Sequence, residues 1–273
     1  MSEQNSAASA SVNRAKPYQL MLFPLNNGAT NVYYVLVLSY IATFGSKVLA
    51  LSMIFASVMV TGMRLFDAIT DPIIGALMDR TNGKFGKFRP FMVIGNLIMA
   101  VSILVLYGLT PLIPASMEWA RYVAFVALYA IWVIGYTFQT SCTRSGQTVL
   151  TNDPKQRPIF AMCDTVYNII LMNILFPVVV TDSLVPKFTL TAENNAAEIA
   201  SLVAQNPALA GIVEKSGGSL SAFYNPGLFT TMQLMFGGLS AVFAICAIIA
   251  LWRKDNSKYF GLGTAQKVGV KDY

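Results

Sequence analysis

The chain has 273 residues, of which 55% are hydrophobic and 12% are charged, with a net charge of +6. This composition is much more apolar than that of a soluble domain. The sequence contains no histidine, which excludes imidazole-based catalysis and most zinc sites. Because the apolar residues form blocks of about 20, the length that a helix needs to cross a bilayer, we predict a polytopic α-helical membrane protein.

Neither an enzyme nor a disulfide scaffold is indicated by the reactive side chains. Cys142, Cys163 and Cys246 fall in or beside apolar segments and show no paired spacing. We interpret them as small packing residues. No nucleophile–base pair is evident, so we predict a protein that is not an enzyme and needs no cofactor.

The chain order predicts two tails around a membrane domain. Residues 1–17 are small and polar, which predicts a flexible tail without a removable signal peptide. Within residues 18–252 we expect six membrane spans, at about 20–44, 49–77, 91–109, 122–148, 159–180 and 228–252. The connection 181–225 forms either a small external cap or a spacer without function. Residues 253–273 form a second tail.

Lysine and arginine residues predict how the spans are oriented. The side that holds both tails and the loops after the second and fourth spans carries thirteen of them. The opposite side carries four, namely Lys47, Arg121, Lys187 and Lys215. Because positive residues concentrate on the cytoplasmic side, we expect both termini to be cytoplasmic. The net positive charge then reflects topology, and we expect no nucleic-acid partner.

Three charged residues interrupt the second apolar segment. Arg64, Asp67 and Asp71 are spaced i, i+3 and i+7, so they share one face of a helix. Charges at membrane depth cost several kcal/mol each, so this face must line a polar cavity. Two carboxylates against one arginine leave a negative charge that a cation or a proton would neutralise. The alternative is a static charge cluster that holds helices together.

The loop after this segment, DRTNGKFGKFRP, predicts a helix stop with two glycines and a proline that begins the next span. Its basic residues either contact anionic headgroups or only enforce the topology. These basic residues are Lys84, Lys87 and Arg89.

The pattern RxxDxxxDPxxGxxxDRT over residues 64–81, followed by GKFRP over 86–90, resembles a family signature. It is similar to that of the glycoside–pentoside–hexuronide:cation symporters, melibiose-carrier relatives within the major facilitator superfamily. The resemblance implies an all-α fold of six transmembrane helices, built as two inverted three-helix repeats. It also implies an N-terminal half that pairs with a C-terminal six-helix half.

The resemblance further implies a site for a monovalent cation, Na⁺, Li⁺ or H⁺, at Asp67, Asp71 and Thr137. It implies a charge network or gate that consists of Arg64, Asp79, Arg80, Lys87 and Arg89. The substrate cavity would be lined by Asn27, Asn31, Tyr34, Tyr136, Thr140 and Arg144.

The chain departs from the family at the substrate positions. Asn31 and Thr140 stand where the melibiose carrier has carboxylates, and Arg144 stands where it has a stacking tryptophan. Amides and hydroxyls bind sugar hydroxyls less strongly than a carboxylate, whereas an arginine suits a carboxylate or a phosphate. These changes favour an acidic sugar such as a hexuronide. The alternative is that Arg144 pairs with Asp67, Asp71 or Asp164.

We therefore expect cation-coupled symport of a sugar or sugar acid by alternating access, in a cell membrane and in contact with its lipids. One alternative is a cation-coupled carrier of a lipid-like or other non-sugar solute. The other is a non-transporting membrane assembly or sensor protein.

Overall fold

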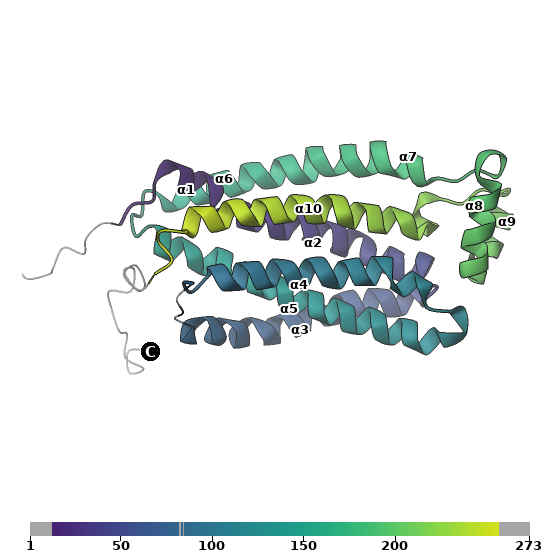
Figure 1. Cartoon of the computed structure of the whole chain (residues 1–273), viewed down its shortest axis with the longest axis horizontal. Helices are drawn as coiled ribbons and strands as arrows, with labels where there is room; N and C mark the ends of the chain where they lie inside the picture. Colours follow the sequence, from purple (N-terminus) through teal and green to yellow (C-terminus); the bar gives the residue numbers. More distant parts are fainter. Residues whose placement is uncertain (1–12, 82, 84, 257–273) are drawn as a thin grey trace, which may run out of the picture.

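The computed structural model describes residues 13–81, 83 and 85–256, and the structural statements below concern these residues. Several predicted features lie outside them: Lys84, residues 1–12, and residues 257–273 with Lys258, Lys267 and Lys271. The described part is an elongated bundle of helices (Figure 1), without strands beyond two isolated bridges. The prediction of an all-α fold is confirmed.

Five helical segments are long and apolar enough to cross a membrane, so the chain is a multi-pass membrane protein. They are Met53–Arg80, Arg89–Leu112, Ala115–Leu150, Arg157–Phe188 and Pro226–Leu251. The first predicted span is divided into α1 (Pro17–Leu22) and α2 (Leu25–Thr43). Three asparagines lower the hydropathy of α2, and it is not among the five. The count of six spans therefore stays a prediction.

Within these segments the remaining long helices have clear bounds. They are α3 (Met53–Arg80), α4 (Arg89–Gly108), α5 (Glu118–Leu150), α6 (Arg157–Ile169) and α10 (Pro226–Leu251). A π-helical turn, Phe44–Val48, extends α2. Two more continue α6 into α7 (Val185–Phe188); these turns are Ile170–Leu175 and Pro177–Leu184.

The helix pairings agree with two three-helix repeats, α2–α3–α4 and α5–α6–α10. The first helix of each repeat packs on the third helix of the other, as α2 on α10 and α5 on α4. The second helix of each repeat packs on the first helix of the other, as α3 on α5 and α6 on α2. The two third helices, α4 and α10, lie against each other. This pattern is the one expected of a half-transporter bundle.

The main core lies where α2, α4, α5 and α10 meet. Tyr33, Tyr107, Phe125 and Phe229 are fully buried there. Close approach of α4 and α5 depends on Gly95 and Gly135, since a Cβ on either would lie within about 3.0 Å of the other's carbonyl oxygen. The two glycines thus allow α4 and α5 to pack closely, as small residues commonly do where membrane helices meet.

The helices α3 and α6 lie at the margin of this core. Only 17% of the most apolar part of each is buried, compared with 44% for α4. Their apolar side chains therefore face lipid or another protein surface. Polar residues of these two helices, such as Asp67 on α3 and Asp164 on α6, are partly exposed rather than enclosed by the bundle.

A small cap covers the end of the bundle at the right of Figure 1. It contains α8 (Ala192–Gln205) and α9 (Ala210–Lys215) around a core of Leu190, Ile199, Leu209 and Leu220. Asn206 Nδ2 donates a hydrogen bond to the Val48 carbonyl at 2.6 Å, which fixes the cap to the end of α2. The helix before it continues to Phe188 through wide turns, so the predicted boundary at residue 181 was too early.

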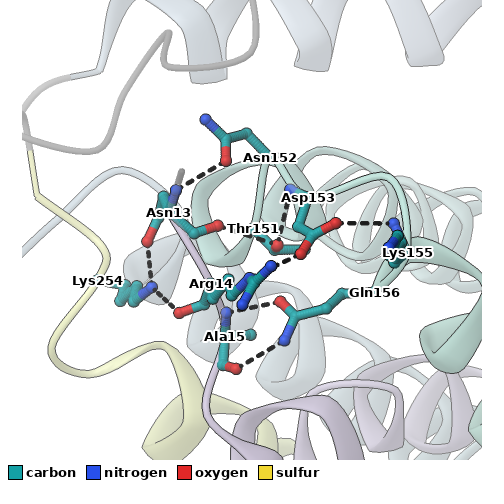
Figure 2. Close-up of polar contacts among 9 residues, drawn as sticks. All are labelled: Asn13, Arg14, Ala15, Thr151, Asn152, Asp153, Lys155, Gln156 and Lys254. Atoms are coloured by element: carbon teal, nitrogen blue, oxygen red, sulfur yellow. Dashed lines mark hydrogen bonds and ion pairs between the residues drawn. The ribbon is translucent and has the colours of Figure 1, made fainter. Parts of the chain in front are cut away.

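We name the opposite end of the bundle the basic end; it comprises residues 13–16, 85–89, 151–156 and 252–256. These segments contact one another there, and their orientation toward the cytoplasm stays a prediction. Residues 13–16, the part of the predicted tail 1–17 that is described before α1, make defined polar contacts (Figure 2). Arg14 Nε lies 2.8 Å from Asp153 Oδ2, and the Ala15 N–H donates to Gln156 Oε1 at 2.8 Å. Lys254 Nζ donates to the carbonyls of Arg14 and Leu150.

A buried carboxylate completes the basic end. Asp255 accepts hydrogen bonds from the backbone N–H groups of Lys87, Phe88 and Arg89 at 2.8 to 3.0 Å. It also lies 3.4 Å from Arg89 Nε, and its side chain is fully buried. Gly86 has φ +91°, and a Cβ there would overlap this carboxylate. The GKFRP segment therefore binds the Asp255 carboxylate through its backbone N–H groups at the N-terminus of α4.

Candidate cation and substrate site

Two of the three predicted cation residues, Asp67 on α3 and Thr137 on α5, contact each other. Thr137 Oγ1 donates a hydrogen bond to Asp67 Oδ1 at 2.7 Å. The Thr70 hydroxyl lies 3.2 Å from the Thr137 hydroxyl and donates to the Asp67 carbonyl at 3.0 Å. Thr137 and Thr70 are buried, whereas Asp67 is partly exposed. A carboxylate and two hydroxyls thus converge, and oxygen ligands are those that hard cations prefer.

Asp71 lies one turn further along α3 and is also partly exposed. The charges of Asp67 and Arg144 both act on its carboxyl group. No group of three acidic, cysteine or histidine side chains that could hold a metal ion occurs in the described part of the chain.

Arg64 is directed at aromatic rings. Its guanidinium lies 5.0 Å from the centre of the Tyr34 ring, and the Tyr34 and Tyr136 rings are 6.1 Å apart. Trp132 stacks on Tyr136 at 5.4 Å. Among the described residues no ion pair within 4.0 Å joins Arg64 to Asp67. The arginine is thus held by cation–π contact, which leaves the Asp67 carboxylate for other partners.

A second polar group lies between α2 and α6. Asn27 Nδ2 donates to both carboxylate oxygens of Asp164, at 2.8 and 2.9 Å. One turn along, Asn31 Nδ2 donates to Asn168 Oδ1 at 2.6 Å. All four side chains are partly exposed. Two of the predicted substrate residues therefore face α6 and bring a carboxylate to the site.

The remaining predicted substrate residues lie apart from this group. The Thr140 hydroxyl donates to the Thr137 carbonyl of its own helix at 3.2 Å. Arg144 is exposed on α5, within electrostatic range of Asp71. Within the described ranges no hydrogen bond or ion pair joins either residue to Asn27 or Asn31.

The predicted charge network is only partly assembled. Lys87 Nζ lies 2.7 Å from Asp79 Oδ1, which connects the loop to the end of α3. Arg89 pairs with Asp255 instead of a residue on α3, and its guanidinium lies 4.9 Å from the Trp252 ring centre. Arg80 is the exposed last residue of α3. Lys87 and Arg89 thus make their contacts at or beside the basic end, away from Asp67 and Thr137.

Three residues of these polar groups, Thr70, Asp164 and Asn168, were not predicted as site residues from the sequence. Thr70 stands between Asp67 and Asp71 on the same helical face, so the spacing could have revealed it. Asp164 and Asn168 are spaced i, i+4 in an apolar segment, which also predicts a shared polar face. The partner of that face, α2, could not be identified from spacing alone.

The family model described as MFS/sugar transport protein matches residues 23–204 of the chain. An uncharacterised symporter of Bacillus subtilis, YnaJ, is 32% identical over 127 residues, 45% of this chain and 27% of that protein. The inner membrane symporter YicJ of Escherichia coli is 30% identical over 138 residues, 50% of this chain and 28% of that protein. A lactose permease of Leuconostoc lactis is 32% identical over 100 residues, which are 36% of this chain and 15% of that protein. The chain therefore covers less than a third of each relative.

Proposed function

Because the chain belongs to the MFS/sugar transport protein family, we propose that it forms the cation site and part of the substrate cavity of a sugar symporter. The observation that carries this proposal is the convergence of Asp67, Thr70 and Thr137 at membrane depth. A carboxylate placed there costs free energy unless a cation or a proton neutralises it. The relatives' names, two symporters and a lactose permease, support the same reading.

We infer that a second six-helix half completes the cavity. The sparse burial of α3 and α6 supports this, since their inner polar residues would otherwise face lipid. A lipid bilayer surrounds the remaining apolar surface. We place the protein in the cell membrane with both termini cytoplasmic, because the tails and loops on the side of the basic end carry thirteen lysines and arginines and the opposite side carries four.

The coupling step follows from charge neutralisation. A cation at Asp67 and Asp71 removes the negative charge that would otherwise disfavour closing the cavity around a solute. Reciprocity requires the solute to tighten cation binding by the same factor, typically about 5- to 150-fold. Rocking of the two halves then exposes the loaded site to each side in turn. The solute is a sugar or a sugar acid.

The test uses the complete protein as its gene encodes it, reconstituted in vesicles. Asp67→Asn and Asp71→Asn each abolish uptake driven by an imposed Na⁺ or H⁺ gradient, because the cation loses its charged ligand. Asp182→Asn, an exposed carboxylate beyond the site, is the matched control and keeps full uptake. Gradient-driven uptake that persists in Asp67→Asn refutes the assignment. Uptake of lysolipids in place of sugars would favour the lipid-like solute, and no uptake of any solute would favour the sensor.

A further inference from the structure

A carboxylate on α6 has no role in the cation site, although it lies at membrane depth. Asp164 is one helical turn before Asn168 and faces α2. Among the described residues no lysine or arginine lies within 4.0 Å of it, so its neighbours are amides and not cations. A carboxyl group in this position needs hydrogen-bond donors from elsewhere to offset its desolvation.

Asn27 holds this carboxylate in one orientation but leaves about half of its acceptor capacity unused. Its Nδ2 lies within 2.9 Å of both oxygens, so one amide group bridges them. A carboxylate offers about four lone-pair sites, of which the amide uses two. Asp164 is also partly exposed, on one of the two least buried of the five long apolar segments. Donors from a bound solute can therefore reach it.

The adjacent turn offers the complementary chemistry. Asn31 and Asn168 share one hydrogen bond, and within the described part of the chain no other hydrogen bond involves either side chain. The pair therefore keeps both donor and acceptor capacity. Sugar hydroxyls are both donors and acceptors, and a carboxylate binds two of them more strongly than neutral groups do. The strip formed by Asn27, Asn31, Asp164 and Asn168 thus suits a polyhydroxylated ring.

The positive charges of the site lie elsewhere. Arg64 is held over Tyr34, and the charge of Arg144 acts on Asp71 across the α3–α5 side. The α2–α6 side consequently carries a negative charge, which repels an acidic solute.

Building on the proposed transport function, we infer that Asp164 is a specificity-determining residue that binds hydroxyl groups of a neutral sugar, with Asn27 as its positioning residue. Acidic sugars are disfavoured by the same charge.

Two variants test the carboxylate against a merely structural role. In the complete protein, Asp164→Asn raises the KM for radiolabelled lactose by about 10- to 100-fold, because hydrogen bonds to a charged acceptor are lost. Its half-saturating Na⁺ or H⁺ concentration stays within about twofold of the unmodified protein, since Asp67 and Thr137 are intact. Asp164→Glu recovers part of the loss, and Asp182→Asn changes nothing. An unchanged KM for lactose in Asp164→Asn overturns the inference.

The preference between neutral and acidic sugars provides a second measurement. Asp164→Asn shifts the ratio of lactose to glucuronate uptake toward glucuronate, whereas Arg144→Gln leaves that ratio unchanged. Loss of glucuronate preference in Arg144→Gln would instead support an acidic solute bound by Arg144 and overturn the inference. Asn27→Ala gives a smaller rise in KM than Asp164→Asn, and a larger one contradicts the positioning role.

Calorimetric binding of lactose to the detergent-purified protein separates this inference from the transport proposal. Binding that is weakened by Asp164→Asn supports the inference even where no gradient-driven uptake is found, in which case only the symport proposal fails. Equal binding to both proteins overturns the inference and leaves symport standing. Absence of lactose binding to the unmodified protein overturns it as well.

Discussion

Asp255 and Asp67 are the same chemical group in two contrasting environments. Asp255, at the basic end, is fully buried and accepts from three backbone N–H groups, with Arg89 beside it. Asp67, between α3 and α5, is partly exposed and accepts from a single hydroxyl among the described residues. The first carboxylate is saturated by the fold itself. The second keeps acceptor capacity for something that the chain does not supply.

The number of hydrogen-bond donors that the chain supplies to a carboxylate distinguishes structural carboxylates from binding ones better than its charge or burial does. A carboxylate that accepts two or three backbone hydrogen bonds is strongly stabilised in its charged form, so it becomes part of the scaffold. A carboxylate with few donors at membrane depth is costly for the fold and is retained for what it binds. Asp164, bridged by one amide, belongs with Asp67 in this division.

The largest effect is expected at Asp255. Asp255→Ala leaves Arg89 and the first N–H groups of α4 without their acceptor, which costs about 3 to 5 kcal/mol, as for other broken buried pairs. We expect a large drop in the melting temperature of the complete protein in detergent, while Asp182→Ala melts like the unmodified protein. Gly86→Ala should destabilise in the same way, because its Cβ would overlap the carboxylate. Melting of Asp255→Ala at the temperature of the Asp182→Ala control would contradict the scaffold role.

A smaller effect, confined to binding, is expected at Thr137. Thr137→Val removes the hydroxyl that bonds Asp67 while it keeps the side-chain shape, so cation affinity falls about tenfold or more. Thr140→Val is the matched control, since that hydroxyl bonds only the backbone of its own helix among the described residues. The cation affinity of each variant is measured as the Na⁺ or H⁺ concentration that gives half-maximal lactose uptake. Equal cation affinities in the two variants would remove Thr137 from the site.

The residues on the cation side of this division were predicted from the sequence, and their role as a cation site stays a prediction. The spacing of Arg64, Asp67 and Asp71 already placed them on one helical face, and the resemblance added Thr137 from another helix. Both inferences depend on local periodicity or on a family motif, and the contact between Thr137 and Asp67 agrees with them. The apolar blocks likewise predicted the long helices, because the bilayer requires that length.

Contacts between distant segments could not be predicted in the same way. Asp255 lies 166 residues beyond Arg89, and nothing in its local sequence indicates a buried acceptor. Residues 13–16 are polar enough for a flexible tail, yet their partners at 152–156 fix them. The pairing of Asp164 with Asn27 also depends on the packing of α6 on α2. The role assigned to Arg144 was left open for the same reason.

The smallest expected effect lies within the basic end, at Asp153, and depends on pH. The pKa of Asp153 is held below its ordinary value, first by the backbone N–H of Lys155 and then by Arg14, against the opposing effect of burial. A carboxyl group with a lowered pKa in the folded state adds stability above its unfolded pKa of about 3.9, and that stability is lost as the pH falls through the folded pKa. Asp153→Asn should therefore lower the melting temperature slightly at pH 6, and the difference should disappear in more acidic buffer. A difference that is equal at pH 6 and in acid would show that the contribution of Asp153 comes from packing, and that this carboxylate belongs with neither Asp255 nor Asp67.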